Sequence, residues 1–488
     1  MLDELPLVLD RDADEPLSVQ VAEGLRAAAS NGLLRADDRL PSSRALAQRL
    51  GVSRTVVAAA YDQLHAEGWI ASRRGSGTFL TTAPAEAPAR PSFRSTAEHP
   101  PELLDLGPGA PCIEAIDQAA WRRAWRAAAD NSPIIRKDRG GEPEFRAAVA
   151  EHLLRHRGLG AGSRTVVLAT AGTSSAVGEL AAALLRPGDA IAMEDPGYQR
   201  AAGAFVAAGV RVIPVPIDAD GLRVDRLPDG IKAVYCTPAH QFPLGTRMQA
   251  ARRVQLVEFA RRAGLLIIED DYDGELRYDT APLPLLAAMA PDVVVHLGTT
   301  SKILSPTLGI GWLVAAPDIT EAIVAHRERT GTGPSPAGQR VLAAFAHHGD
   351  LARHLRRLRR AVPPRRALVV DELRRRGLDV LGDDAGSHVV VPLDSAETEQ
   401  RAVAAGRARG VALDGLSRHH LAAQHHPLAT AAGPHTFGIA LGYTALSWTE
   451  LTTAVPIAGE CLTQAWVQPN SRATKGMLSG SEPATVAL

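Results

Sequence analysis

The stretch VVVHLGTTSKILSPTLGIGWLVA, residues 293–315, places one lysine between two apolar segments that read as buried strands. Lys302 follows directly after the hydroxyl side chains of Thr299 and Ser301. A lysine amine forms a Schiff base with an aldehyde cofactor, and nearby hydroxyl groups suit a phosphate. A surface lysine after a strand is the simpler alternative, so this interpretation needs support from other parts of the chain.

Two further strand ends carry groups of matching chemistry. In LATAGTSSAVGEL, the residues Gly172, Thr173 and Ser174 stand between a strand and a helix, where backbone N–H groups and the helix dipole favour phosphate. In EDPGYQRA, Tyr198 follows the next strand and offers an aromatic face to a flat ring. A loop glycine and a tyrosine at the edge of the core are the ordinary alternatives.

The segment LLIIEDDYDGELRY, residues 265–278, ends another apolar strand with two more candidates. A carboxylate at the position of Asp270 keeps a pyridine nitrogen protonated and makes the ring an electron sink. Tyr272 lies two positions along, on the same face of an extended chain, where its hydroxyl donates to a ring phenolate. A helix-capping aspartate tied to Arg277 is the alternative, but the order of these strand ends disfavours it.

Residues 7–80 have the pattern of a winged helix-turn-helix. Two short amphipathic segments flank Gly51, each with a serine placed as its cap, and two short strands joined through GSG form a wing. Between residues 39 and 80, six arginines against two acidic residues give a local charge of +4, in a chain whose net charge is −1. A helical bundle with solvated arginines is the alternative. The candidate contacts to bases and phosphates of DNA are Ser42, Arg44, Ser53, Arg54, Thr55, Arg73 and Arg74.

The remaining composition is that of a globular protein, with 45% hydrophobic and 22% charged residues. Residues 103–466 alternate apolar strands with amphipathic helices, which predicts an α/β fold with a mainly parallel sheet. We expect residues 81–102 to be an exposed linker and residues 467–488 to be disordered. Three scattered cysteines indicate neither a disulfide framework nor a zinc site. No signal peptide or membrane span is expected, which favours a cytoplasmic protein.

The N-terminal pattern, LPSSRALAQRLGVSR followed by EGW and GSGTFL, resembles the head of GntR-type bacterial regulators. The strand ends, EDDYDGELRY above all, resemble fold-type I aminotransferases, which have a mainly parallel sheet and a smaller C-terminal domain. Together, over residues 7–466, the chain resembles the MocR subgroup of GntR regulators. The resemblance implies that Lys302 holds pyridoxal 5′-phosphate (PLP), with Asp270 at the pyridine nitrogen, Tyr272 at the ring oxygen and Tyr198 stacked on the ring. It implies that the phosphate contacts come from Gly172, Thr173, Ser174, Thr299 and Ser301.

Three positions depart from that family pattern. Gly309 stands seven residues after the lysine, where the family has an arginine that grips the phosphate. Arg136, in RKDRGG, replaces a tyrosine that reaches the phosphate of the neighbouring subunit, so it is a candidate to supply the missing cation. Ala440, in FGIALGY, stands where aminotransferases have the arginine that holds the substrate α-carboxylate. In TPAHQFPLG, His240 or Gln241 is a candidate to replace the usual asparagine contact.

These features predict a PLP-dependent transcriptional regulator that binds operator DNA, forms a homodimer and responds to a small-molecule effector. PLP itself or an amino acid is the candidate effector, and catalytic turnover is doubtful without the carboxylate clamp. A working aminotransferase and a regulator with a decayed cofactor site are the alternatives. We expect the histidines at positions 419, 420, 425, 426 and 435 to form a polar loop and not a metal site.

Overall fold

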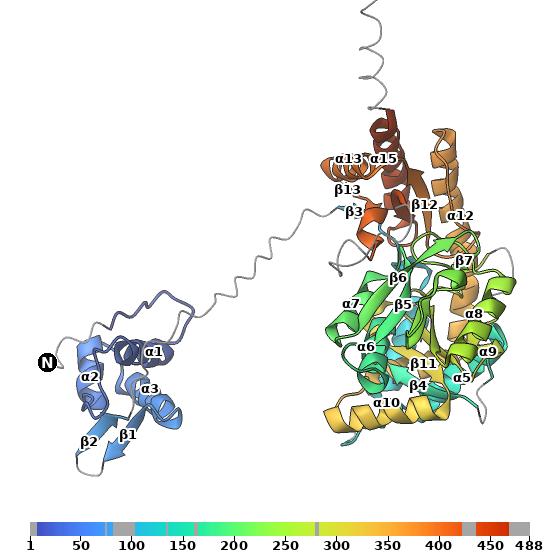
Figure 1. Cartoon of the computed structure of the whole chain (residues 1–488). Helices are drawn as coiled ribbons and strands as arrows, with labels where there is room; N and C mark the ends of the chain where they lie inside the picture. The colour runs from blue at the N-terminus through green and yellow to red at the C-terminus, as the bar shows by residue number, and fades with distance from the viewer. Residues whose placement is uncertain are drawn as a thin grey trace, which may run out of the picture. The chain divides into compact units, whose positions relative to one another are not determined.

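The structure is a computed structural model, and it describes residues 7–73, 76–81, 103–132, 135–160, 164–278, 283–421 and 436–467. The chain divides into two compact units, Met1–His99 and Pro100–Leu488. We call the first unit the head and the second the large unit (Figure 1).

Within its described residues, the head has three helices and a two-stranded antiparallel wing. Gly51 adopts a left-handed conformation, with φ of 64°, in the turn between the second and third helices, which a side chain would strain. Ser42 accepts a hydrogen bond from the backbone N–H of Ala45, and Ser53 accepts one from Val56, so both predicted caps are present. The elements are α1 Leu17–Ser30, α2 Ser43–Leu50, α3 Arg54–Ala66, β1 Ile70–Arg73 and β2 Gly77–Leu80.

The large unit is built on an eight-stranded sheet in the order β4-β11-β10-β9-β8-β5-β6-β7. Strands β10, β9, β8, β5 and β6 are parallel to one another, whereas β11 runs antiparallel to both of its neighbours. The strands are β4 Val166–Thr170, β5 Ala190–Asp195, β6 Arg211–Asp218, β7 Gly221–Leu222, β8 Ala233–Cys236, β9 Leu266–Asp271, β10 Val294–Thr299 and β11 Gly311–Ala315.

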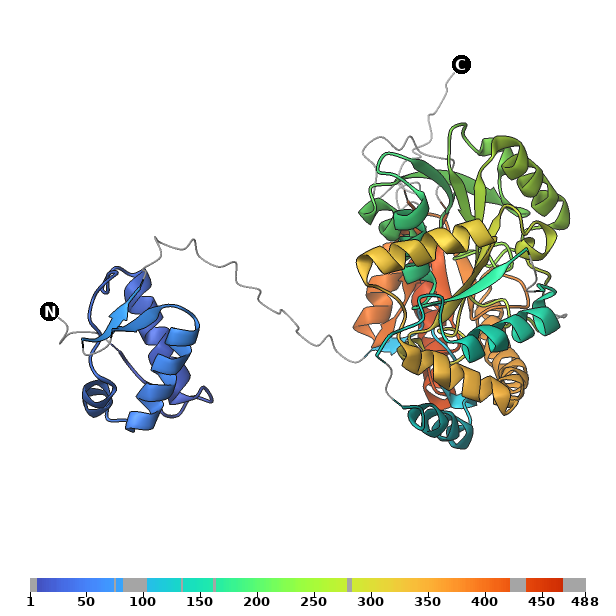
Figure 2. The same ribbon diagram turned by 90° about the horizontal axis from the view of Figure 1, so that it is seen from below.

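Helices cover both faces of this sheet (Figures 1 and 2). Alternate residues of β5 show why, because Ala190 and Ala192 belong to one buried cluster, whereas Ile191 and Met193 belong to the other. Helices α6, α7 and α10 pack on the face of Ile191, and α5, α8 and α11 pack on the opposite face. Their bounds are α5 Pro143–Arg157, α6 Thr173–Leu184, α7 Gln199–Ala207, α8 Ala250–Ala263, α10 Pro317–Thr330 and α11 Pro336–His347.

A smaller part of the large unit is formed mainly by the chain that follows the long helix α12, Asp350–Arg375, together with the upstream strand β3. It contains a three-stranded sheet in the order β12-β15-β14 and a short pair of β13 with β3. Its elements are β3 Leu104–Asp105, β12 His388–Leu393, α13 Ala396–Ala408, β13 Val411–Ala412, β14 Asp414–Gly415, β15 Phe437–Gly442 and α15 Trp448–Val467. Two helices outside this part, α4 Gln118–Ala129 and α9 Leu286–Met289, complete the large unit with short 3-10 turns. In the part of the chain that the structure describes, no helix has the length and apolar character needed to cross a membrane.

The predicted linker and the predicted disordered tail lie outside the described residues, apart from residues 81 and 467.

Candidate functional site

The site lies where the carboxyl ends of the parallel strands meet. In the register of the sheet, Gly298 of β10 pairs with Asp271 of β9, and Cys236 of β8 pairs with Glu269 of β9. The residues that follow these strand ends are therefore neighbours in space, which is the usual location of a ligand site in a sheet of this kind. The predicted candidates that follow β4, β5, β8, β9 and β10 therefore lie at one edge of the sheet.

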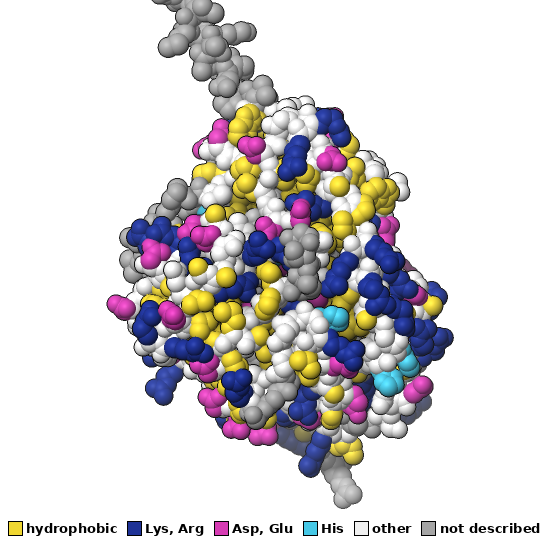
Figure 3. Space-filling view, turned by 90° about the vertical axis from the view of Figure 1, so that its right-hand side faces the viewer, with side chains coloured by type: hydrophobic (Ala, Val, Ile, Leu, Met, Phe, Trp, Pro, Cys, Tyr) yellow, Lys and Arg dark blue, Asp and Glu magenta, His cyan; other side chains and the backbone are white. Residues whose placement is uncertain are grey.

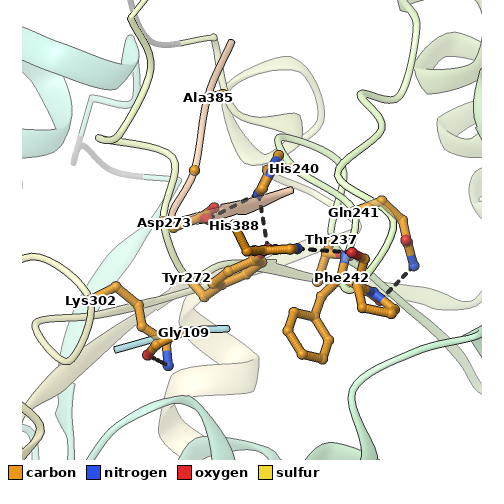
Figure 4. Close-up of polar contacts among 12 residues, drawn as sticks. Gly109, Thr237, His240, Gln241, Phe242, Tyr272, Asp273, Lys302, Ala385 and His388 are labelled. Atoms are coloured by element: carbon orange, nitrogen blue, oxygen red, sulfur yellow. Dashed lines mark hydrogen bonds and ion pairs between the residues drawn. The ribbon is translucent and has the colours of Figure 1, made fainter. Parts of the chain in front are cut away.

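Lys302 lies in the turn after β10 and is half-buried. Its Nζ donates a hydrogen bond to the carbonyl oxygen of Gly109 (Figure 4), and a Cβ at Gly109 would lie only 2.9 Å from that Nζ. Burial lowers the pKa of Lys302, although the carboxylates of Asp273 and Asp270 act in the opposite direction. A lysine with a lowered pKa holds more of the neutral amine, which is the nucleophilic form.

Asp270 lies at the end of β9 and is 2% exposed. Its Oδ2 accepts a hydrogen bond of 2.5 Å from the hydroxyl of Tyr235, while its Oδ1 has no partner among the described residues. Burial raises the pKa of Asp270 to about 7, against the opposing effects of Tyr235 and Lys302. A buried carboxyl oxygen without a partner is costly, and a cationic N–H group would satisfy it.

Tyr272 follows β9 and is fixed by a histidine and an aspartate (Figure 4). The Nδ1 of His240 lies 3.0 Å from the hydroxyl of Tyr272 and 3.0 Å from Oδ2 of Asp273. Gln241 points elsewhere, because its amide donates to the backbone carbonyls of Pro196 and Phe242. Of the two predicted replacements for the asparagine, His240 therefore faces the candidate site and Gln241 serves the backbone.

The residues that were predicted to bind the phosphate lie around the N-terminus of α6. Gly172 precedes this helix with φ of 112°, and no side chain caps the helix, so its first N–H groups are left for a ligand. Ser174 Oγ lies 3.1 Å from the hydroxyl of Tyr198, and the hydroxyl of Thr299 donates to Ser301 Oγ over 3.0 Å.

These hydroxyls lie on two neighbouring loops, since a Cβ added at Gly172 would lie 3.9 Å from Oγ1 of Thr299. Thr173, the first residue of α6, is buried. The five predicted phosphate contacts thus lie at two neighbouring places, the start of α6 and the end of β10.

The three positions at which the sequence departs from the family pattern have different surroundings. Gly309 ends a 3-10 turn in a left-handed conformation, with φ of 59°, and nothing lies within 4 Å of an added Cβ. Arg136 is exposed, and no contact joins it to the other candidates among the described residues. Ala440 is fully buried in a small apolar cluster with Val390 and Leu416.

Sequence reasoning missed Arg200, which is exposed in the first turn of α7. Burial raises the pKa of Tyr198. The hydrogen bond with Ser174 opposes that rise most strongly, and Arg200 opposes it as well. Burial lowers the pKa of Lys302, and Arg200 adds to that decrease. The described residues give Arg200 no carboxylate partner. Its position two residues after Tyr198 was the only signal in the sequence.

Phe242 was also missed as a site residue. Its ring makes edge contacts with the rings of Tyr198 and Tyr272, at centroid distances of 5.7 and 5.9 Å. It therefore links the two tyrosines that the sequence placed separately.

The expectation of a polar loop is wrong for two of the five histidines. His419 and His420 are both 4% exposed, and they lie against the carboxylates of Asp414 and Asp195. The other three lie outside the described residues. Among the residues that are described, no group of three or more His, Cys, Asp or Glu side chains has the arrangement of a metal site.

In the head, the candidate DNA contacts fall on one end of α3, on α2 and on the wing. Ser53, Arg54 and Thr55 are exposed at the N-terminus of α3, and Ser42 and Arg44 are exposed at the start of α2. Arg73 pairs with Asp37, and its guanidinium lies 4.6 Å from the centre of the Phe79 ring. Arg74 lies outside the described residues.

Comparison with known proteins assigns both units. Residues 17–80 match the family "Bacterial regulatory proteins, gntR family", and residues 101–431 match "Aminotransferase class I and II". The chain is 37% identical over 381 residues to the HTH-type pyridoxine biosynthesis transcriptional regulator PdxR of Corynebacterium glutamicum, covering 76% of this chain and 82% of that protein. It is 35% identical over 441 residues to the probable rhizopine catabolism regulatory protein MocR of Rhizobium meliloti, covering 84% and 89% of the two chains.

Solved structures share the fold of the large unit. The kynurenine aminotransferase of Pyrococcus horikoshii superposes with a TM-score of 0.66 at 24% identity, over 74% of this chain and 91% of that one. The aminotransferase class I and II family depends on PLP, and the buried acceptor of Asp270 and the lysine at the strand ends fit that cofactor. The head binds DNA as other gntR-family heads do. The chain therefore belongs to the MocR-type GntR transcriptional regulators, which join a DNA-binding head to an aminotransferase-like domain.

Proposed function

We propose that the regulator senses PLP, or an adduct of PLP with an amino acid, at the strand ends around Lys302. The observation that carries this proposal is the unpartnered Oδ1 of the buried Asp270, in a site that also holds a lysine of lowered pKa. When bound, PLP supplies an aldehyde that takes up an amine and a ring that withdraws electrons. In this proposal Lys302 holds the aldehyde carbon, and Asp270 accepts the ring N–H.

The remaining residues position the cofactor. The hydroxyl of Tyr272, fixed by His240 and Asp273, would donate to the ring oxygen, and Tyr198 would stack on the ring. The N-terminus of α6 and the hydroxyls of Ser174, Thr299 and Ser301 would hold the phosphate. Because Gly309 brings no cation to this phosphate, Arg136 of a second subunit supplies one in a homodimer.

The effector is an amine or carboxylate compound of small size, or PLP alone. Ala440 removes the usual clamp for an α-carboxylate, but Arg200 brings a guanidinium that has no carboxylate partner among the described residues near Lys302 and Tyr198. Arg200 is thus the one observation that favours a second function, an aminotransferase that uses a relocated carboxylate clamp. Turnover of an amino acid with a keto acid, lost in Arg200→Gln, is the result that this second function requires.

Regulation then follows from differential binding. A ligand that binds one arrangement of the large units better than another increases the population of that arrangement. The two heads, which are tethered to the large units, then bind paired half-sites of DNA better or worse.

The first test is a titration of the purified protein with PLP, followed by visible absorption. We expect a saturable band above 400 nm in the wild type and none in Lys302→Ala, with free PLP subtracted as the reference. Lys232→Ala, which removes a lysine elsewhere in the same unit, serves as the matched control and keeps the band. No saturable band in the wild type at high PLP would mean that the cofactor site has decayed, and DNA binding by the head would stand alone.

A further inference from the structure

The large unit carries a strongly basic surface that the cofactor site does not use. Figure 3 shows a dense group of Lys and Arg side chains on one side of this unit, with few acidic side chains among them. Residues 117–129 and 350–360, which contain α4 and the first half of α12, hold eight arginines and only two acidic residues, Asp117 and Asp350.

Both acidic residues are already engaged in joining the two helices. Asp350 accepts from Arg123 and Arg353 at 2.6 Å each, and Asp117 accepts from Arg357 at 2.7 Å. The described residues supply no carboxylate to the other five arginines, and we call these five the basic face. They are Arg122 and Arg126 on α4, and Arg356, Arg359 and Arg360 on α12.

The basic face is electrostatically unfavourable in the unbound protein. Arg356 and Arg360 are like charges four positions apart on one helix, and both stand close to Arg353 and Arg357. A bound polyanion offsets this repulsion, since it brings negative charge to the guanidinium groups.

We propose that the basic face is a second DNA-contacting surface, which binds the phosphate backbone beyond the segment that the head reads. The partner is DNA because the head of the same chain already holds it, so the local concentration of flanking duplex at the large unit is high. Arginine side chains without competing carboxylates are suited to phosphate oxygens, and such contacts position the duplex without reading its sequence. This inference rests on DNA binding by the head.

The test compares two triple variants in the full-length chain. Arg126→Gln, Arg356→Gln and Arg360→Gln together neutralise the basic face. Arg186→Gln, Arg329→Gln and Arg407→Gln together remove the same charge from exposed arginines elsewhere in the large unit that have no carboxylate partner among the described residues. The probes are duplexes recovered from a random pool with the wild-type chain, each prepared without flanks and with 30 base pairs added on both sides.

We expect the flanks to tighten binding of the wild type and of the control triple, but not of the basic-face triple. On the long duplex, the slope of log affinity against log salt should fall by about 2 to 3 in the basic-face triple, as expected for about three lost phosphate contacts. Its melting temperature should stay level or rise, because like-charge repulsion is removed, and its PLP absorption band should persist.

Equal flank dependence and salt slope in the two triples would overturn the inference, while operator binding by the head would remain established. Failure of the wild type to recover any duplex from the pool would instead contradict DNA binding by the head. If the basic-face triple lost as much affinity for the short duplex as for the long one, relative to the wild type, this result would also count against a flanking contact.

Discussion

At the scale of single residues, Asp270 combines deep burial with an unsatisfied acceptor at the candidate site. Its Oδ1 is buried without a partner, and burial raises its pKa to about 7. The folded chain therefore keeps a proton on this carboxyl group at pH values where the unfolded chain has lost it. A protonated pyridine nitrogen next to Asp270 would favour the carboxylate and reverse this relation.

The pH dependence of stability tests this description. Because the pKa of Asp270 is higher in the folded state, its contribution is fully present below the ordinary aspartate pKa of 3.8 and is lost as pH rises from there through about 7. Without PLP, the unfolding free energy of the wild type should fall relative to Asp270→Asn between pH 5 and 7, by at most about 1.4 kcal/mol per pH unit. Chemical denaturation at several pH values gives the difference.

Saturating PLP should remove most of that pH-dependent difference from the wild type and leave the curve of Asp270→Asn unchanged in shape. Parallel curves for the two proteins without PLP would show that Asp270 has an ordinary pKa.

The sequence alone identified those candidate residues whose chemistry depends on a single strand end. Lys302, Asp270, Tyr272 and the glycine-hydroxyl turn before α6 all follow apolar strands, and the structure brings them to one edge of the sheet. The partners of these residues were not predictable. The contact of His240 with Asp273, and the charge of Arg200 near Lys302, depend on how loops from different strands approach one another.

At the scale of elements, the strands that the sequence placed before Gly172, Tyr198, Asp270 and Lys302 are present as β4, β5, β9 and β10, but their spatial order and the reversed direction of β11 could not be read from apolar runs. The acidic motif after β9 shows the same division. Asp271 pairs with the buried Arg157, and Glu275 lies 3.1 Å from His152, so these two acids hold α5 against the sheet. Asp271 and Glu275 stand in the same short acidic motif as Asp270, so the sequence alone does not distinguish an acid that stabilises the fold from one that faces the candidate site. Only their packing in the structure distinguishes them.

The element-scale prediction concerns the turn that ends at Gly309. In the proposed homodimer, Arg136→Ala removes the phosphate cation and should weaken PLP binding about 10- to 100-fold. Gly309→Arg in that background should recover much of the loss, because nothing lies within 4 Å of a new Cβ. Affinities come from the visible absorption titration.

The control for this pair is Gly309→Ala in the same background. Gly309→Arg and Gly309→Ala both strain a residue with φ of 59°, at a cost of about 1 kcal/mol or more, so both should lower the melting temperature equally. Only the arginine should change PLP affinity. Unchanged PLP affinity in Arg136→Ala would show that the phosphate is held without this residue.

At the scale of the whole molecule, the head and the large unit each have their own buried core. The head uses Leu46, Val57 and Leu64 inside a cluster that contains no residue of the large unit. Each unit can therefore keep its own ligand when the site of the other is removed. Regulation then requires that PLP binding by the large unit and DNA binding by the head be coupled. Such coupling is reciprocal, so a change that PLP causes in DNA affinity equals the change that DNA causes in PLP affinity.

The last prediction separates the two binding activities. Arg54→Gln, at the exposed N-terminus of α3, should weaken DNA binding about 10- to 100-fold and leave the PLP band intact. Arg35→Gln, an exposed head arginine outside the helix-turn-helix, should leave both unchanged. Lys302→Ala should keep DNA binding without PLP and lose every effect of PLP on it, because the cofactor acts through that lysine. Gel shifts with and without PLP measure DNA binding by all three variants, and the visible absorption titration measures their PLP band. If Lys302→Ala still responded to PLP, the sensing site would lie elsewhere; if Arg54→Gln lost the PLP band, the two units would not bind their ligands independently.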